Sequence, residues 1–251
     1  MALQEEFEEQ GNWLFKNRSL LPLIILVITL GYYLYSKKVG TTFLVDFDAD
    51  DFNYQMACLL VGFFGLFIRI YTVGYTPEKT SGRNEKGGQL AETLNSTGIY
   101  SLVRHPLYVG NYFMWLGPAL LTGNFWFIVS FTLLYWLYYE KIMFAEEQFL
   151  RGKFGDMYLN WAKTLPPFVP NFKNFKKPEL SFSWRKVLKK EKNGLAAMFM
   201  IFALFDISGK YIQDQNDFNY VFIYGTIATV IIYLFLKILT KKTSALNEKG
   251  R

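Results

Sequence analysis

Six long apolar runs constrain the fold of this chain more than any other feature of its sequence. A helix that crosses a bilayer needs roughly 20 apolar residues, and the chain has runs of about this kind at 20–35, 52–73, 107–122, 125–144, 194–207 and 218–239. We therefore predict an all-α integral membrane protein with about six transmembrane helices. The third run is short and is joined to the fourth by the turn residues Thr122-Gly123-Asn124. This pattern predicts a short helical hairpin that barely crosses the bilayer.

The basic residues fall almost entirely on one side of these expected spans. If the N-terminus is cytoplasmic, 24 of the 27 Lys and Arg residues lie in cytoplasmic segments, and only Lys37, Lys38 and Lys210 lie outside. Because cytoplasmic loops are rich in Lys and Arg, we expect both termini to be cytoplasmic, whether or not the hairpin crosses fully. The first apolar run follows an acidic start and has no small-residue cleavage site, so we expect it to be an anchor.

The runs and the charge pattern divide the chain into four segments. Residues 1–51 are a tail, the first span and an outer loop, and 52–170 form the core. Residues 171–193 are a basic linker with interleaved aromatic residues, and 194–251 hold two further spans and a cytoplasmic tail. The linker lies at the headgroup level or is simply solvated. Three prolines at 166, 167 and 170 rule out a continuous helix before it.

Several kinds of chemistry can be set aside. The chain has one His and one Cys, which argues against a protein metal site. Cys58 lies within an apolar run and is interpreted as a small core residue. We find no P-loop, no glycine-rich dinucleotide fingerprint and no serine nucleophile elbow, and we expect no nucleic-acid partner. Without a Rossmann domain, a cofactor must be held by helix ends and loops at the cytoplasmic membrane face.

Polar residues at the two ends of the expected hairpin offer such a place. Pro106 suits the first turn of a helix, so Arg104 and His105 would stand at its mouth, where a helix start favours anions. Glu146 and Glu147 return to the same side at the other end of the hairpin. A pocket with both signs of charge suits a zwitterionic cofactor. Alternatively, Arg104 and His105 are ordinary interfacial anchors.

The spacing of these residues resembles that of a known family. The motifs are Gly98-Ile99-Tyr100, Arg104-His105-Pro106, Tyr108 and Gly110, followed by Glu146-Glu147, Phe154-Gly155, Tyr158 and a proline segment that ends at Pro170. The order of these motifs, and the gap between the part that ends at Gly110 and the part that begins at Glu146, resemble those of a known family. This family is the membrane methyltransferases that act on isoprenylcysteine carboxyl groups and on phospholipids. The resemblance covers roughly residues 52–170.

The resemblance implies an S-adenosylmethionine cofactor bound without a Rossmann domain. It places catalytic roles on Arg104, His105 and Glu146. The implied cofactor contacts are Glu92, Thr93, Leu94, Asn95, Tyr100, His105, Pro106, Leu107, Tyr108 and Glu146.

Two features bear on the methyl acceptor. The prenylcysteine enzymes have a substrate-binding arginine four residues before the glutamate that matches Glu146, whereas this chain has Ile142 there, with Lys141 beside it. The loop at 76–84 is similar to that of bacterial members that methylate lipid A phosphates, and Arg and Lys with hydroxyl donors suit phosphate recognition. The expected acceptor contacts are Arg69, Lys79, Arg83 and Lys141. Alternatively, these cations only set the membrane topology.

We therefore expect an S-adenosylmethionine-dependent O-methyltransferase that acts on a membrane lipid, with a lipid A phosphate as the acceptor and a bacterial inner membrane as the location. The alternatives are isoprenylcysteine carboxyl or phosphatidylethanolamine methylation, a sterol-reductase-like enzyme with a nicotinamide cofactor, or a non-enzymatic membrane protein. A transporter would carry buried charges within its spans. The apolar runs hold almost none, which argues against that class.

Overall fold

The computed structural model describes residues 2–18, 21–40, 50–78, 80 and 89–250. Within these residues the chain is helical, and its one β-bridge pairs Gly98 with Lys176. The α-helices are α1 (Leu3–Lys16), α2 (Leu21–Val39), α3 (Phe52–Tyr75), α4 (Pro106–Leu120), α5 (Phe125–Phe154), α6 (Asp156–Ala162), α7 (Trp184–Ile212) and α8 (Tyr220–Lys242). Two 3-10 turns, η1 (Ile99–Ser101) and η2 (Phe172–Asn174), lie in the connections.

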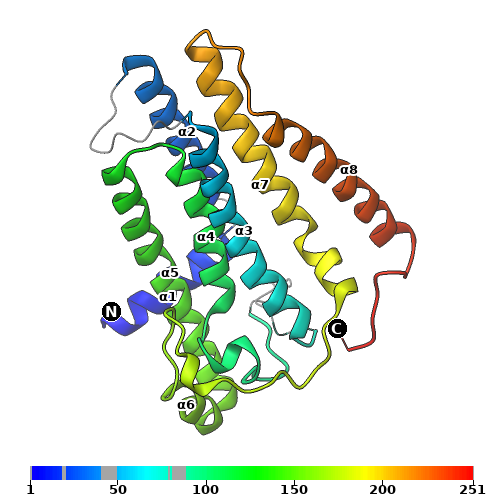
Figure 1. The fold of residues 1–251 in the computed structure, drawn as a ribbon. Coiled ribbons are helices and arrows are strands. Elements are labelled where there is room, and N and C mark those ends of the chain that lie inside the picture. The colour runs from blue at the N-terminus through cyan, green and yellow to red at the C-terminus, as the bar shows by residue number, and fades with distance from the viewer. Residues whose placement is uncertain (1, 19–20, 41–49, 79, 81–88, 251) are drawn as a thin grey trace.

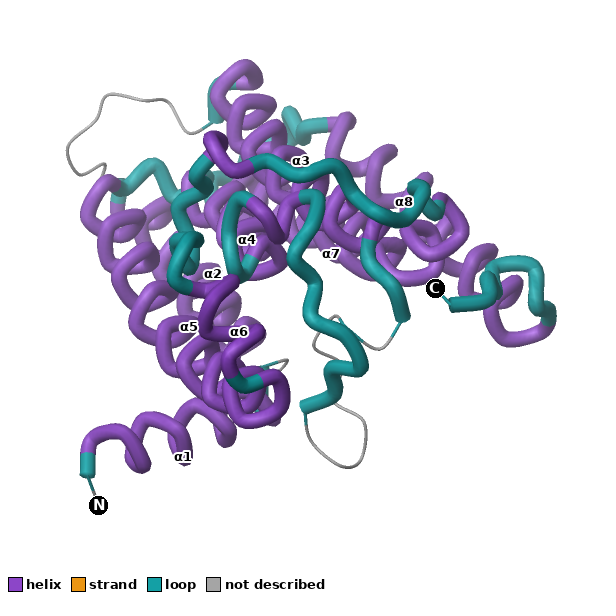
Figure 2. Tube along the Cα trace, turned by 90° about the horizontal axis from the view of Figure 1, so that it is seen from below, coloured by secondary structure: helices purple, strands orange, loops and turns teal. Residues whose placement is uncertain are grey.

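Helix α3 is the centre of a bundle of long helices (Figure 1). It packs against α4 on one side and α7 on the other. Helix α4 in turn packs against α5, and α7 packs against α8. Loops, α6 and both described ends of the chain gather at one end of the bundle, which faces the viewer in Figure 2. This loop-rich end holds the polar residues of the two sequence motifs.

Four helices are long and apolar enough to cross a membrane: Pro22–Val39, Phe52–Tyr75, Trp184–Ile212 and Tyr220–Lys242. They correspond to four of the six expected spans. The expected hairpin exists as α4 and α5, but α4 has only 15 residues, which rise about 23 Å. Neither helix of the hairpin is among the four. Six spans are thus not confirmed, while the helical fold and the turn at residues 122–124 are.

Local sequence signals set several helix boundaries. Asp51, Asn124 and Asn219 each precede a helix and accept a hydrogen bond from a backbone N–H of its first turn. Pro106 is the first residue of α4. The basic linker differs from our expectation, because Ser183 caps α7 and the helix begins at Trp184 instead of near residue 194. The basic residues from Arg185 onward therefore belong to the first turns of a helix.

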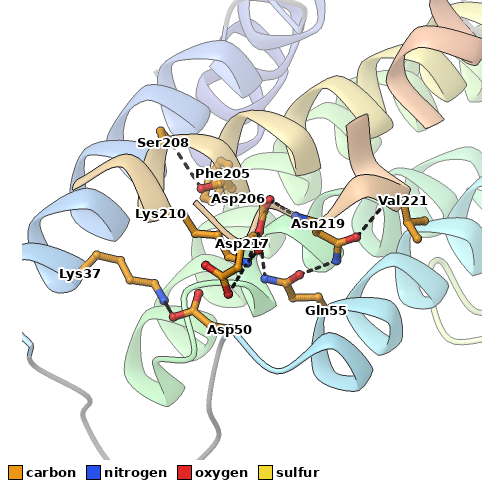
Figure 3. A network of polar contacts seen from close by, with 10 residues as sticks. All are labelled: Lys37, Asp50, Gln55, Phe205, Asp206, Ser208, Lys210, Asp217, Asn219 and Val221. Carbon is orange, nitrogen blue, oxygen red and sulfur yellow. Dashed lines mark hydrogen bonds and ion pairs between the residues drawn. The ribbon is translucent and has the colours of Figure 1, made fainter. Parts of the chain in front are cut away.

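Buried charged side chains at the far end of the bundle correct a second expectation (Figure 3). Asp206 of α7 is 2% exposed and accepts hydrogen bonds from the Gln55 amide at 3.3 Å and from the Asn219 backbone at 2.7 Å. Lys210, which we expected in an outer loop, is buried in α7 and lies 3.7 Å from Asp206 and 3.4 Å from Asp217. These contacts tie α3, α7 and α8 together, so the helices do carry charge where composition suggested almost none.

Helix α1 crosses the side of α5 at the loop-rich end. Phe15 is 2% exposed and belongs to a cluster that includes Tyr139 and Met143 of α5. Gly11 permits this close approach, because a Cβ atom there would lie 2.2 Å from the backbone oxygen of Lys141. The amphipathic α1 is therefore fixed against α5 by shape, a packing that we did not predict from the sequence.

A glycine substitution tests this packing. Gly11→Ala should destabilise the protein by on the order of 1–3 kcal/mol, because the added methyl group meets backbone and α1 must shift. Gly31→Ala in α2 is the matched control, since its Cβ would meet nothing within 4 Å. Thermal unfolding in detergent measures both variants. Equal midpoints would show that α1 does not pack as described.

Candidate active site

The segment before α4 is held in place by backbone hydrogen bonds to the proline segment that follows α6. The Arg104 and His105 backbone N–H groups donate to the carbonyl oxygens of Pro166 (3.0 Å) and Pro167 (3.2 Å). The Asn171 N–H donates to the Leu102 carbonyl at 2.9 Å. The proline segment cannot form a helix, so its carbonyl groups are available to position the residues at the mouth of α4.

The His105 ring lies between two carboxylates of α5. Its Nε2 is 2.9 Å from Glu147 Oε1, and its Nδ1 is 3.5 Å from Glu146 Oε2. Arg104 Nη1 donates to the other oxygen of Glu147 at 2.7 Å. Because a protonated imidazole donates from both nitrogens, this arrangement favours the imidazolium form. We refer to His105, Glu146 and Glu147 as the histidine clamp.

The pKa values of the clamp residues follow from these contacts. Burial lowers the pKa of His105, but hydrogen bonds to Glu146 and Glu147 and their negative charges outweigh burial, so the pKa is raised. Burial raises the pKa of both glutamates, yet the hydrogen bonds and charge of His105 outweigh it and lower both values. The contacts of the clamp thus favour a cation between two anions.

Aromatic residues of α4 and α5 extend the clamp into the bundle. The Tyr108 ring stacks on His105 with centroids 5.6 Å apart, and its hydroxyl donates to Glu146 at 2.9 Å. Tyr135 donates its hydroxyl proton to the Tyr108 carbonyl at 2.7 Å. Tyr139 stacks on Tyr135 with centroids 4.2 Å apart. These contacts fix the carboxylate of Glu146 on its α4 side.

A cavity of about 320 Å³ adjoins the clamp. Small-molecule sites begin at roughly this volume, about 300 Å³. Its wall carries guanidinium, carboxylate, amide and aromatic groups from α1, α3, α4, α5, α6 and the connection before α4. The lining includes Arg18, Arg69, Gln89, Thr93, Leu94, Asn95, Tyr100, Arg104, His105, Leu107, Tyr108, Asn111, Tyr139, Glu146 and Trp161.

Most of the residues that the resemblance implied as cofactor contacts line this cavity. They are Thr93, Leu94, Asn95, Tyr100, His105, Leu107, Tyr108 and Glu146. Glu92 and Pro106 are not part of the lining; Pro106 is buried as the first residue of α4. Arg104, expected to be catalytic, also lines the cavity, with its guanidinium paired to Glu147.

The expected acceptor contacts are distributed differently. Arg69 lines the cavity and is paired bidentately with Glu191 of α7, at 2.8 and 2.9 Å. Lys141 does not line it, because its side chain turns to α1 and donates to Gln10 at 2.5 Å. Lys79 and Arg83 lie outside the described residues.

The sequence motifs did not reveal the contributions of Phe15, Arg18 and Trp161. Phe15 and Arg18 reach the cavity from the end of α1, and Trp161 reaches it from α6. The Trp161 indole N–H donates to the Tyr100 carbonyl at 3.2 Å. An amphipathic pattern in residues 3–16 would have indicated a surface helix, but no local signal links its end to a site that lies about 90 residues later.

The pH dependence of stability tests the clamp. His105 has a raised pKa, so its contribution is complete below its ordinary value of 6.5 and is lost as pH rises through the raised value. The glutamates have lowered pKa values, so their contribution is complete above 4.5 and is lost as pH falls through the lowered values. The substitution His105→Gln should therefore lower the thermal unfolding midpoint, relative to wild type, by more at pH 6 than at pH 9. A deficit that stays constant or grows with pH would contradict the clamp.

Comparison with known proteins identifies the core segment. The sequence model of the Phospholipid methyltransferase family matches residues 53–157. The protein-S-isoprenylcysteine O-methyltransferase of Schizosaccharomyces pombe is 41% identical over 78 residues, 31% of this chain and 33% of that protein. Those of Xenopus laevis and Homo sapiens are 35% and 33% identical over 94 residues, 38% of this chain and 32% of each protein.

The chain thus spans about a third of the length of these relatives. No solved structure matches it significantly. The matched segment contains α3 from its second residue, the motif residues from Gly98 to Gly155 and both glutamates of the clamp. Residues 53–157 thus match the Phospholipid methyltransferase family model, and the chain is similar to the isoprenylcysteine O-methyltransferases over 78 to 94 residues.

Proposed function

We propose that this protein is a membrane O-methyltransferase that uses S-adenosylmethionine and methylates an acidic acceptor of the isoprenylcysteine carboxylate kind. The observation that carries the proposal is the histidine clamp at the wall of the 320 Å³ cavity, built by residues of the family segment. Most of the residues with implied cofactor roles meet there. The relatives' names supply the reaction class.

The cavity residues fit this cofactor by their chemistry. S-adenosylmethionine combines a cationic sulfonium, a zwitterionic amino acid and an adenosine group, and the wall offers both signs of charge, amides and aromatic rings. Two of its buried polar atoms, Gln89 Oε1 and Arg104 Nε, have no hydrogen-bond partner among the described residues. Buried polar atoms usually have one, so these two suit a polar ligand. The bound cofactor would supply an activated methyl group.

The side chains would act by binding and positioning. Glu146 is held by Tyr108 and His105, and it presents negative charge to the cavity. His105 is poorly suited to act as a general base, because carboxylates at both ring nitrogens favour its protonated form, which has no lone pair to accept a proton. A carboxylate acceptor is already ionised at neutral pH and needs positioning more than deprotonation. This favours O-methylation over methylation of the phosphatidylethanolamine amine.

The choice of a carboxylate over a lipid A phosphate follows the relatives. All three relatives compared above are isoprenylcysteine O-methyltransferases by name, and they are 33–41% identical to this chain over 78 to 94 residues. Of the cations that suggested a phosphate, Arg69 is neutralised by Glu191 and Lys141 contacts α1. The lipid A phosphate remains the second acceptor to assay.

We also propose that the cavity opens at the cytoplasmic face, with both termini on that side. The C-terminal tail contacts the same end of the bundle: the Glu78 N–H donates to the Gly250 carbonyl at 3.2 Å, and Ser183 bonds to Glu248. The basic residues concentrate at this end, as in cytoplasmic loops.

Reporter fusions test this orientation. Fusions after residues 175 and 251 should report a cytoplasmic location, and a fusion after 214 should report the opposite side, because α7 and α8 separate these positions. A fusion after residue 175 that reports outside would overturn the orientation, independently of any enzymatic assay.

Substitution of the clamp tests the cofactor site. Glu146→Gln should weaken binding of S-adenosylmethionine by about 1.5–3 kcal/mol, because it removes a charge and alters the contacts with His105 and Tyr108. Glu140→Gln is the matched control, since Glu140 is exposed on the same helix. Calorimetric titration measures affinity, and transfer of a labelled methyl group to a farnesylated cysteine analogue measures activity. Equal affinities in folded wild type and Glu146→Gln would refute the site.

A further inference from the structure

The chain between α6 and the first turn of α7 crosses the loop-rich end of the bundle (Figure 1), and we call its residues 169–185 the strap. Near its end the strap is attached to α3. The Ser183 N–H donates to the Gly74 carbonyl at 2.9 Å, and the Phe182 ring packs edge-on against Tyr75 with centroids 5.1 Å apart. A Cβ atom on Gly74 would lie 2.2 Å from the Phe182 ring, so a glycine permits this contact. The strap therefore meets α3 at the last residues of an apolar span.

The lengths of the helices place this contact at the membrane surface. Helix α3 has 24 residues, which rise about 36 Å, whereas the hydrocarbon core of a bilayer is about 30 Å thick. Helix α7 has 29 residues and rises about 44 Å. The C-terminal end of α3 and the N-terminal end of α7 therefore extend beyond the core into the headgroup region. The strap joins α7 at that level.

The strap presents apolar and basic side chains together. Four apolar side chains are half or more exposed: Val169, Phe172, Phe175 and Trp184. Four cations are exposed among them, Lys173, Lys176, Lys177 and Arg185, together with one acid, Glu179. Aromatic rings are favoured at the interface between membrane and water, and Lys and Arg are attracted to anionic headgroups. The strap thus combines both features of a segment that contacts an anionic lipid surface.

The strap also holds the connection that leads into α4. The Lys176 carbonyl accepts a hydrogen bond from the Gly98 N–H at 2.9 Å, and the Lys176 N–H donates to the Ser101 hydroxyl at 2.8 Å. Between Gly98 and Ser101 lies Tyr100, which lines the cavity. The backbone that carries the exposed lysines therefore also fixes a part of the cavity wall.

We propose that the strap binds an anionic membrane surface, with its exposed rings in the headgroup region and its Lys and Arg side chains on lipid phosphates. Because the strap holds the connection with Tyr100, this contact also stabilises the cavity. The lipid contact stands apart from the proposed function, whereas its effect on the cofactor rests on that function. An acidic protein surface would suit the cations alone. The membrane fits better, because the strap begins at the end of a span and mixes cations with exposed rings.

Nanodiscs of two compositions provide the test. Full-length protein is reconstituted in phosphatidylcholine alone and in phosphatidylcholine with phosphatidylglycerol. Hydrogen–deuterium exchange of the strap amides measures the lipid contact, and calorimetric titration measures the affinity for S-adenosylhomocysteine. Two variants each lose three exposed cations. The strap variant is Lys173→Gln with Lys176→Gln and Lys177→Gln, and the control is Arg151→Gln with Lys153→Gln and Lys163→Gln.

We expect phosphatidylglycerol to slow exchange of the strap amides in wild type by on the order of tenfold, because several cations near an anionic surface add their attractions. The strap variant should lose this response and the control should keep it. High salt should weaken the response in wild type, since the lysines are exposed. The affinity for S-adenosylhomocysteine should rise with phosphatidylglycerol in wild type and in the control, and stay constant in the strap variant.

The lipid contact is overturned if exchange in wild type ignores the lipid charge, which would leave an acidic protein as the partner of the cations. It is also overturned if the strap variant responds like wild type, or if the control loses the response as well. A slowed exchange with an unchanged affinity would refute the link between the strap and the cavity. Absence of S-adenosylhomocysteine binding in both compositions would instead refute the proposed function, while the exchange data would still decide the lipid contact.

Discussion

The placement of one imidazole between two carboxylates is the constraint on which the rest of the site depends. His105 precedes α4, whereas Glu146 and Glu147 lie in the last part of α5, and the three groups satisfy one another at 2.9 and 3.5 Å. A buried glutamate or a buried imidazolium alone would be costly, so the pairing requires both helices of the hairpin to return to the same end of the bundle. Tyr108, Arg104 and the cavity wall are then positioned around it.

The sequence predicted most of the helices because bilayer-length apolar runs and capping residues are local signals. Pro106 and Asn124 begin helices where expected. The start of α7 was missed because its first turns are basic. In the structure the Lys186 ammonium is buried and donates to the carbonyl oxygens of Thr76 and Pro77, at 2.5 and 3.0 Å. Its partners lie more than 100 residues earlier, and no local pattern announces such a contact.

The same limit applies to charge within the bundle. Asp206, Lys210, Gln55 and Asn219 are each unremarkable in sequence, but the structure brings them together from α3, α7 and the start of α8. At the site, Tyr100, His105, Tyr108 and Glu146 could be predicted because a family spacing links them. The pairing of Arg69 with Glu191 could not, since Glu191 lies outside that spacing. Arg69, which we expected to contact the acceptor, instead links α3 to α7 through this ion pair.

The cavity wall is built from two parts of the chain, the segment that matches the family model and the end of α1. The clamp and most of the cavity wall lie within residues 53–157, so the proposed methyl-donor site is built mainly by the segment that matches the family model. Phe15 and Arg18 come from a helix that joins this core only through its packing on α5. A change at the end of α1 would therefore alter this wall of the cavity and, through the charge of Arg18, the pKa of Glu146. Ile142 is closed within the apolar cluster, so this position of α5 presents no charge to the cavity, and the polar groups of the wall come from the other positions around it.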